Sequence, residues 1–595
     1  MRAEWLLIGV LTLSLLTGVP KQVQGGPEGD GDETDSLLMR EAAARRISWR
    51  AEGPIEERDR FGLVKILAIN DFHGQLLGGS RTGGRPVGGA AVLVSYLKKA
   101  QSTPPDVNVT ESTVIVHAGD HVGASAPESS FFQDEPSITF LNLLANQHCS
   151  YVDRMNPQCN MVGTLGNHEF DEGQGEMLRL INGGTHRSGP FFEDPYRGVR
   201  FPYVSANVVD KTNGQPILPP FVIKEIDGVR LAFIGAVLKE TPTIVTSTGV
   251  DGLVFLEEAE SVNRYVGQLR QGEGIHTFVV LIHQGGRQTS YAGPTQPGVI
   301  MTGQEITRII EHLDDDVDVV VSGHSHAFTN ALVKNRNGKD ILVTQALSYG
   351  TAYADIRLMI DRSNGEVFEK SAAVVSTYAD EGPGLMPDPT VKQLVSLAQQ
   401  KVAPLVTRVI GQAAADITRA ENEAGESALG NLIADAQRAT LKTDFAFMNP
   451  GGIRTDVSAG PVTYRDLFTV QPFGNSLVRM TLAGSQIYEL LNQQWLNQPQ
   501  RILKVSGLTY TWDSSRPVGD RVIEVRQNGM PIDRAASYSV TTNDFLAAGG
   551  DNFSVFLKGE NQRGGPIDLK VLISYLEGFS RPFAASIEGR ITRVN

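Results

Sequence analysis

The sequence contains few cysteines and few positive charges for its length of 595 residues. Its 53 lysine and arginine residues stand against 67 aspartate and glutamate residues, and the formal net charge is −14. Such a surface repels nucleic-acid polymers, and no basic run with interleaved aromatics is present, so we expect no polymeric nucleic acid as a partner. A small anionic substrate is compatible with this charge if metal ions and a few arginines hold it locally.

The only two cysteines, Cys149 and Cys159, lie in the segment HCSYVDRMNPQC. A zinc site is not expected here, because His148 is the only other soft ligand nearby. In an exported protein, two cysteines are more often paired than free. We therefore predict a local disulfide in the loop before the strand that leads to Asn167 and His168.

The N-terminal stretch has the features of an export signal. Arg2 provides a short basic start, and an apolar core runs from Trp5 to Val19. We predict a signal peptide at residues 1–25 and a periplasmic or extracellular location. The apolar core is too short for a comfortable membrane span, so we expect no stable membrane insertion, with an uncleaved anchor as the alternative. Residues 26–62 are charged and poor in large apolar side chains, which predicts a disordered acidic tether.

The chain is too long for one hydrophobic core, and its patterning predicts two domains. Residues 63–375 alternate buried strands with amphipathic helices, which indicates an α/β or layered fold. Residues 376–405 are predicted to be an interdomain linker with a helix that breaks or ends near Pro404. Residues 406–595 form the second domain, which begins with the strand-like stretch 406–419 and continues with a helix and a further strand.

Five predicted strands of the first domain each end in an Asp, Asn or His side chain. The runs are LVKILAIN, TVIVHAG, NMVGTLG, TFVVLI and VDVVVSG, and the side chains at their ends are Asp71 with His73, Asp120, Asn167, His283, and His324 with His326. Because open α/β sheets keep their sites at the carboxyl ends of the strands, we predict a metal centre there. These side chains suit two divalent ions, with Zn²⁺ and Mn²⁺ equally compatible.

The spacing within these motifs predicts how the ligands are shared. Asp71 and His73 alternate along a segment that we expect to be extended, so both side chains would point toward one ion. The same argument applies to the two histidines of the last motif. Gly119 allows the strand end to turn sharply, which makes Asp120 the candidate for a carboxylate that bridges both ions. Asn167 would supply a neutral amide oxygen, which limits the negative charge near a phosphate.

His168 follows Asn167 directly and is expected to face a different direction. Asp171, three residues later, can orient the imidazole, as expected for a general acid that protonates a leaving oxygen. The alternative is that His168 is one more metal ligand.

The second domain contains residues suited to a nucleotide. Arg454 follows a glycine turn and can bind a phosphate through two N–H groups. Phe473 and Phe545 lie in glycine-rich loops, and Asp551 follows the second of them. Each phenylalanine alone is more typical of a core, but together they can sandwich a planar base while Asp551 binds ribose hydroxyls.

These motifs resemble those of the calcineurin-like metallophosphoesterases, and the chain from about Leu63 onward resembles the secreted 5'-nucleotidase / UDP-sugar hydrolase family. The resemblance implies a four-layer α/β/β/α first domain joined by a helical connector to an α+β substrate-binding domain that rotates. It assigns one ion to Asp71, His73, Asp120 and His326, the other to Asp120, Asn167, His283 and His324, and the catalytic dyad to His168 and Asp171.

The segments GGIR, PFGN and FLAAGGD match those that bind phosphate, base and ribose in that family. Asn449 matches an Asn near the base or phosphate, although Pro450 replaces the usual Gly after it. Some relatives carry an Arg at the position of Gly425, and Arg419 is the nearest candidate to take over its phosphate contact.

We therefore expect an exported, metal-dependent 5'-nucleotidase whose small-molecule substrate bridges an interdomain cleft. The alternatives within enzymes are a 2',3'-cyclic-nucleotide phosphodiesterase or UDP-sugar diphosphatase that uses the same metals, and a sulfur-compound hydrolase. A non-catalytic surface-binding protein is the alternative in a different class. Neither base preference nor oligomeric state follows from the sequence.

Overall fold

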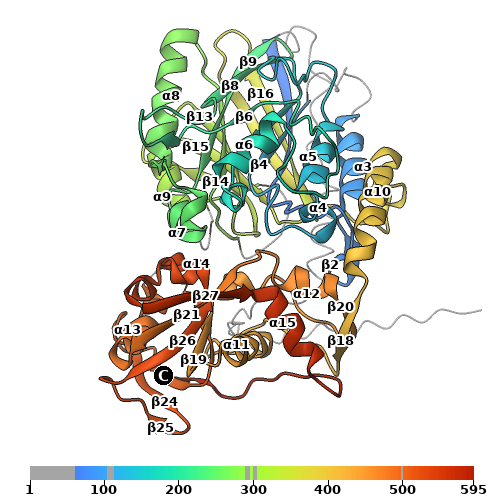
Figure 1. The fold of residues 1–595 in the computed structure, drawn as a ribbon. Helices are drawn as coiled ribbons and strands as arrows, with labels where there is room; N and C mark the ends of the chain where they lie inside the picture. Colours follow the sequence, from blue (N-terminus) through green and yellow to red (C-terminus); the bar gives the residue numbers. More distant parts are fainter. Residues whose placement is uncertain (1–59, 103–112, 289–294, 299, 301–303, 497–499) are drawn as a thin grey trace, which may run out of the picture.

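The computed structural model describes residues 60–102, 113–288, 295–298, 300, 304–496 and 500–595. The predicted signal peptide and nearly all of the predicted tether lie outside these residues. The described chain forms two domains, one above the other in Figure 1, and helix α10 (Pro389–Val406) lies along the side where the chain passes between them.

The first domain contains two mixed β-sheets. The six-stranded sheet has the order β17-β16-β1-β4-β5-β6, with β17 Val367–Ser376, β16 Ala352–Asp361, β1 Phe61–Ile69, β4 Thr113–Ala118, β5 Met161–Thr164 and β6 Tyr203–Val204. The seven-stranded sheet has the order β12-β14-β15-β13-β11-β9-β8, with β12 Gln296–Pro297, β14 Phe328–Lys334, β15 Asp340–Ala346, β13 Val317–Ser322, β11 Phe278–His283, β9 Val229–Val237 and β8 Phe221–Ile226.

The central strands run parallel and are buried on both faces. β1 pairs in parallel with β4 and β4 with β5, and in the other sheet β11 pairs in parallel with β13. The sequences TVIVHA, FVVLIH and VDVVVS of β4, β11 and β13 are buried throughout, as is typical of parallel strands covered on both faces. All five strands predicted to precede the ligands are therefore confirmed, and their carboxyl ends meet.

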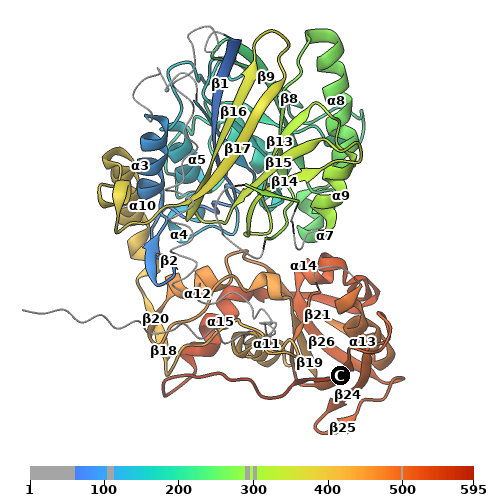
Figure 2. The same cartoon turned by 180° about the vertical axis from the view of Figure 1, so that it is seen from behind.

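Four layers make up this domain. An apolar core that includes Ile66 of β1, Phe233 of β9 and Leu281 of β11 fills the space between the two sheets. Helices α3 (Ala90–Gln101), α5 (Glu135–Asn142) and α6 (Gln174–Asn182) pack on the outer side of the six-stranded sheet. Helices α8 (Glu258–Glu273) and α9 (Gln304–His312) cover the other sheet, as Figure 2 shows from behind. The predicted α/β/β/α layering is confirmed.

Helix α10 connects the domains and packs on the first one, against α3, α4 (Pro127–Ser130) and α5. The carboxylate of Asp388 caps its start by accepting bonds from two backbone N–H groups. The helix passes Pro404 without a break and ends two residues later at Val406, in agreement with the predicted end near the proline. Pro404 lacks the N–H of one helical bond, but Val406 is fully buried and holds the last turn.

The second domain is an α+β unit. Its five-stranded sheet has the order β22-β19-β26-β21-β27, with β22 Lys504–Ser506, β19 Phe445–Met448, β26 Ser537–Asn543, β21 Ser476–Ala483 and β27 Glu560–Ile567. Helices α11 (Ala428–Leu441) and α15 (Asp568–Glu577) pack on one face, and α13 (Gly484–Asn492) packs on the other. The strand-like stretch 406–419 forms only the short strand β18 (Val409–Ala413), which pairs with β20 (Gly460–Thr463).

A second contact joins the domains beside α10. Arg465 of helix α12 (Tyr464–Val470) forms an ion pair with Glu128 of α4, whose side chain is fully buried. The ring of Phe131 lies 5.1 Å from that of Phe468, so an aromatic contact accompanies the charge pair. The two domains therefore meet through a charged and an apolar contact on the side where α10 connects them.

The predicted disulfide is present, and it joins Cys149 to Cys159 in the loop before β5. Within the described parts of the chain, no helix has both the length and the apolar character needed to cross a membrane. The exact domain boundaries at residues 375 and 405 stay predictions.

Candidate active site and metal centre

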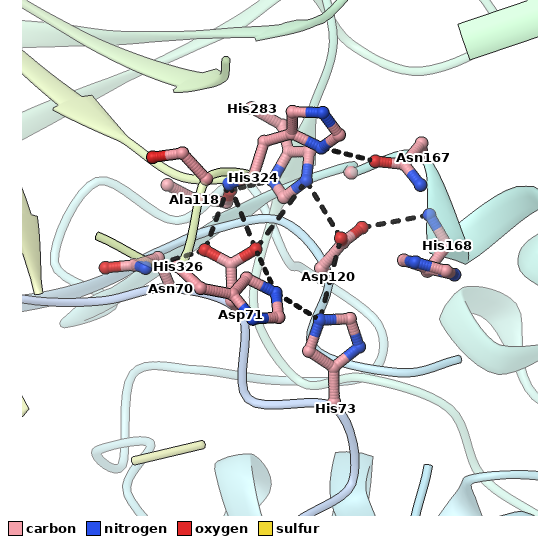
Figure 3. A network of polar contacts seen from close by, with 12 residues as sticks. Asn70, Asp71, His73, Ala118, Asp120, Asn167, His168, His283, His324 and His326 are labelled. Carbon is pink, nitrogen blue, oxygen red and sulfur yellow. Dashed lines mark hydrogen bonds and ion pairs between the residues drawn. The ribbon is translucent and has the colours of Figure 1, made fainter. Parts of the chain in front are cut away.

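The predicted ligand side chains converge at the carboxyl ends of the strands, between the two sheets (Figure 3). Oδ2 of Asp120 lies 2.9 Å from Nε2 of His283 and 3.8 Å from Nε2 of His73. Nε2 of His326 lies 3.4 Å from Oδ1 of Asp71. Side chains that are separated by up to 255 positions in the sequence thus share one buried site.

The candidate ligands form two neighbouring groups. Asp71, His73 and His326 place their ligand atoms within 4.8 Å of one another, and so do Asp120, His283 and His324. Oδ1 of Asn167 lies 3.0 Å from Nδ1 of His324, which adds an amide oxygen to the second group. One oxygen of Asp120 faces both groups, in keeping with the predicted bridging carboxylate. The residues are therefore arranged to hold metal ions.

The backbone conformation of the ligands differs from the one expected. Asp71 and His73 have φ angles of 47° and 49°, and His324 and His326 have 75° and 54°. These residues are in the left-handed region and not in an extended segment, so alternation along a strand is not what aligns their side chains. Non-glycine residues avoid this region at a cost of order 1–3 kcal/mol each, and such strain is concentrated at functional sites.

Two glycines allow the strand ends to approach. Gly119 has φ 81°, and a Cβ atom there would lie 2.5 Å from the backbone nitrogen of Gly166. A Cβ atom at Gly166 would lie 2.1 Å from Oδ1 of Asp120. The prediction that Gly119 permits a sharp turn is confirmed, and Gly166 is needed equally for the bridging carboxylate to fit.

The hydrogen bonds of the imidazoles fit a cation at this site. Nδ1 of His73 lies 2.8 Å from the carbonyl oxygen of Gly123, and Nδ1 of His283 lies 2.7 Å from that of Ala118. Because a carbonyl can only accept, both Nδ1 atoms donate, and in the neutral rings both Nε2 atoms then present lone pairs toward the Asp120 carboxylate. A metal ion between these groups, or a proton on Nε2 of His283, would satisfy them.

The charges of the site lead to the same requirement. Burial raises the pKa of Asp71 to about 7. Burial opposes protonation of His283, yet the nearby Asp120 raises the pKa of His283 to about 10. Without a metal ion the protonated His283 ring offsets the Asp120 charge, and divalent cations held by these residues would take over that role.

The predicted dyad forms. Nδ1 of His168 lies 2.7 Å from Oδ2 of Asp171, across a short 3₁₀ turn (His168–Phe170). Burial opposes a charged His168 ring, but the carboxylates of Asp171 and Asp120 outweigh it and raise its pKa above the ordinary value. His168 also comes within the ligand distance of His73 and Asp120, so the geometry is compatible with the alternative role of a metal ligand.

Two supporting residues were missed from the sequence. The buried carboxylate of Glu169 accepts bonds from the backbone N–H groups of Asp120, His121 and Gly166 at 3.0, 2.9 and 2.5 Å. The amide of Asn70 donates to Oδ2 of Asp71 at 2.6 Å. Each of these two residues is adjacent in the sequence to a predicted site residue. That adjacency was the signal from which a supporting role could have been predicted.

A cavity of about 450 Å³ connects the two domains at this site. Asn167, His168, Asp171 and His324 line it from the first domain, and the predicted residues Asn449, Arg454, Phe473, Phe545 and Asp551 line it from the second. The structure thus brings the dyad together with five of the six predicted substrate residues.

Polar contacts order the second-domain wall. Asn543 donates to Oδ1 of Asn449 at 3.0 Å, and Asn449 donates to Oδ2 of Asp551 at 3.2 Å. Burial raises the pKa of Asp551. The Phe473 ring stacks on the ring of His168, with centroids 5.7 Å apart, so this aromatic contacts the dyad directly.

The structure does not bring Arg419 into the cavity. Arg419 is exposed and is not among the residues that line the cavity, and its backbone N–H group bonds to Asp456. Arg501 lines the cavity instead, with Nε 3.3 Å from Oδ1 of Asp551. No motif surrounds Arg501 in the sequence, and it reaches the site only because its chain segment folds against the turn at Gly425.

Comparisons with known proteins agree with this geometry. Residues 64–328 match the family model of calcineurin-like phosphoesterases, and residues 409–558 match that of the 5'-nucleotidase C-terminal domain. Endonuclease YhcR of Bacillus subtilis is 34% identical to this chain over 537 residues. The match covers 89% of this chain and 41% of YhcR, so this chain spans less than half the length of that relative. Cell wall protein Lmo0130 of Listeria monocytogenes is 34% identical over 565 residues, covering 89% of this chain and 69% of that protein.

Among solved structures, the 5'-nucleotidase precursor from Thermus thermophilus is similar, with a TM-score of 0.70 and 27% identity. The match covers 90% of this chain and 99% of that one, so both domains correspond. The chain therefore belongs to the metal-dependent phosphoesterases that combine a calcineurin-like phosphoesterase domain with a 5'-nucleotidase C-terminal domain.

Proposed function

We propose that the protein is an exported 5'-nucleotidase that hydrolyses nucleoside 5'-monophosphates to nucleoside and phosphate. The observation that supports this is the cavity in which the dyad faces Arg454, Phe473, Phe545 and Asp551. A ligand that combines a phosphate, a ribose and a planar base would find a candidate metal centre, a carboxylate and aromatic side chains in this one cavity.

We propose that the first ion is held by Asp71, His73, Asp120 and His326, and the second by Asp120, Asn167, His283 and His324. Two divalent cations bound there would activate water and offset the negative charge of the phosphoryl oxygens. Zn²⁺ and Mn²⁺ both suit these ligands.

The protein's own residues position and protonate the substrate. Arg454 binds phosphoryl oxygens, and its guanidinium lies 5.8 Å from the centre of the Phe473 ring, at the cavity wall. His168 gives its proton to the departing 5'-oxygen, and Asp171 holds the imidazole in place through Nδ1. Phe473 and Phe545 offer aromatic surfaces to the base, and Asp551 accepts hydrogen bonds from the ribose.

The test is phosphate release from AMP, 2',3'-cyclic AMP, UDP-glucose and a sugar phosphate, with metal-stripped protein to which Zn²⁺ or Mn²⁺ is returned. Metal-dependent hydrolysis that prefers AMP is the expected result. Preference for the cyclic nucleotide or for UDP-glucose would replace the proposal with a phosphodiesterase or diphosphatase at the same site. Hydrolysis of the sugar phosphate alone would contradict the assignment of the second domain.

Export is supported by the disulfide between Cys149 and Cys159, since such bonds persist in oxidising compartments. N-terminal sequencing of the protein recovered from the periplasm or culture medium tests this part separately. A mature chain that still begins with Met1 would contradict the predicted signal peptide.

A further inference from the structure

The second domain presents a second guanidinium to the cavity besides that of Arg454. Arg501 lines the cavity, and its side chain is 24% exposed, while Asp551 beside it is 8% exposed. Its backbone N–H group bonds to the carbonyl oxygen of Gln494 at 3.0 Å, and the Gln494 side chain accepts a bond from Leu503 at 2.7 Å. Gln494 therefore anchors the backbone at Arg501 itself and two residues later.

The turn at Gly425 explains why this arginine comes from position 501. Gly425 has φ 94°, and a Cβ atom there would lie 2.5 Å from the side chain of Ile502. Lys504 donates to the carbonyl oxygen of Gly425 at 2.8 Å, which holds the two segments together. The space that a side chain at position 425 would need is thus filled by the segment that carries Arg501.

Both arginines line the same cavity as residues of the first domain. Arg454 and Arg501 come from the second domain, and Asn167, His168 and His324 line the cavity from the first. A phosphoryl group at the candidate metal centre would therefore share one cavity with both guanidinium groups.

We propose that Arg501 is a second arginine, besides Arg454, that binds the phosphoryl group undergoing hydrolysis, and that Asp551 positions its guanidinium. This inference rests on the proposed function. The Asp551 carboxylate lies at 3.3 Å from Nε alone, and a guanidinium carries five N–H donors, so its terminal N–H groups can bind phosphoryl oxygens without breaking that pair. Asp551 then links the ribose site to the phosphate site through one side chain.

The test uses the full-length protein loaded with Zn²⁺ or Mn²⁺ and compares wild type with Arg501→Gln, Arg501→Lys and the control Arg526→Gln. Arg526 is an arginine of the same domain that pairs with Glu524 at the surface, away from the cavity. Calorimetry measures binding of inorganic phosphate and, separately, of adenosine. Steady-state kinetics measure hydrolysis of AMP and of p-nitrophenyl phosphate, which has neither ribose nor a nucleobase.

Arg501→Gln is expected to weaken phosphate binding at least 10-fold and to lower kcat/KM for both substrates by a similar factor, with adenosine binding within 2-fold of wild type. Arg501→Lys should retain part of the phosphate affinity and part of kcat/KM, because it keeps the positive charge but loses the planar guanidinium group. Unchanged phosphate binding in the Gln variant, or an equal loss of adenosine binding, would overturn the proposal. If the Gln variant does not fold, the binding constants of the Lys variant for phosphate and for adenosine test the proposal in the same way.

A failure of the proposed function is distinguishable from a failure of this inference. Wild-type hydrolysis of p-nitrophenyl phosphate without hydrolysis of AMP would contradict the nucleotidase assignment, while the phosphate-binding comparison would still decide the role of Arg501.

Discussion

Replacing Glu169 with alanine should disturb the metal centre without removing a ligand. The Glu169 carboxylate accepts three backbone N–H groups, those of Asp120, His121 and Gly166, and the residue is only 6% exposed. It therefore joins the end of β4 to the end of β5 at the bridging ligand. Removing it leaves three buried donors without an acceptor.

The expected loss of stability follows from these contacts. A buried donor left unsatisfied costs about 1–3 kcal/mol, so three such donors give about 3–9 kcal/mol for Glu169→Ala. Glu169→Gln is the matched variant: its one remaining oxygen can keep the two bonds to Asp120 and Gly166, so it should lose about 1–3 kcal/mol. Because domains are stable by about 5–15 kcal/mol, the Ala variant should unfold much more easily.

Denaturant unfolding and steady-state kinetics measure both effects. A shift of about 1 Å in a positioned group can cost about 100-fold in rate, so kcat of Glu169→Ala should fall by about that factor. Glu260→Ala, at an exposed position of α8, serves as the control and should change stability by less than about 0.5 kcal/mol. If Glu169→Ala unfolds at the wild-type denaturant concentration and keeps its kcat, the role assigned to this carboxylate is refuted.

Three further predictions concern the rest of the molecule. Burial lowers the pKa of Lys224 to about 7, so between pH 7 and pH 9 the unfolded chain binds more protons than the folded one. The free energy of unfolding of the wild type should therefore rise with pH in this range, by up to about 2–3 kcal/mol relative to Lys224→Met. Parallel curves of this free energy against pH for the two proteins would contradict the prediction. Replacing Cys149 and Cys159 by serine should lower the free energy of unfolding by about 2–3 kcal/mol. It should also abolish any effect of a reductant on the unfolding midpoint. If the reductant still shifts the midpoint of the double variant, the disulfide is not the cause of the effect. Arg465→Met leaves the buried carboxylate of Glu128 without its partner, at a cost of roughly 3–5 kcal/mol. Small-angle scattering should then show a wider distribution of domain arrangements, and an unchanged curve would show that this ion pair does not set the arrangement.

The metal-binding half of the site was predictable because its signal is local. Each ligand follows a buried strand directly, and parallel strands of one sheet bring their carboxyl ends together, so Asp71, Asp120 and Asn167 could be placed at one edge. The conformation of the ligands was not predictable in this way. The left-handed φ angles of Asp71 and His73 arise from backbone bonds to Gly119 and Asp120, which come from a different strand.

The supporting contacts required the folded structure. Arg419 was the nearest arginine in sequence to Gly425, but it is exposed, its backbone N–H group bonds to Asp456, and it does not line the cavity. Arg501 is 76 positions away from Gly425, and only the packing of Ile502 against that turn brings it to the cavity. Proximity in sequence was therefore the wrong guide for a side chain that is positioned by tertiary packing.

The division of the site between two cores has a consequence for catalysis. The ligands and the dyad are fixed by the sheets of the first domain, whereas Arg454 and Asp551 are fixed by the sheet of the second, so no single core determines the distance between them. That distance depends on the contacts between the domains. α10 and the ion pair of Arg465 with Glu128 lie on one side, and α7 (Thr241–Ile244) packs near the 3₁₀ turn Gly550–Asn552 of the second domain. The stacking of Phe473 on His168 shows how closely the two halves meet. A change that loosens the Arg465 contact should therefore weaken substrate binding while the metal ligands, which all belong to the first domain, stay in place.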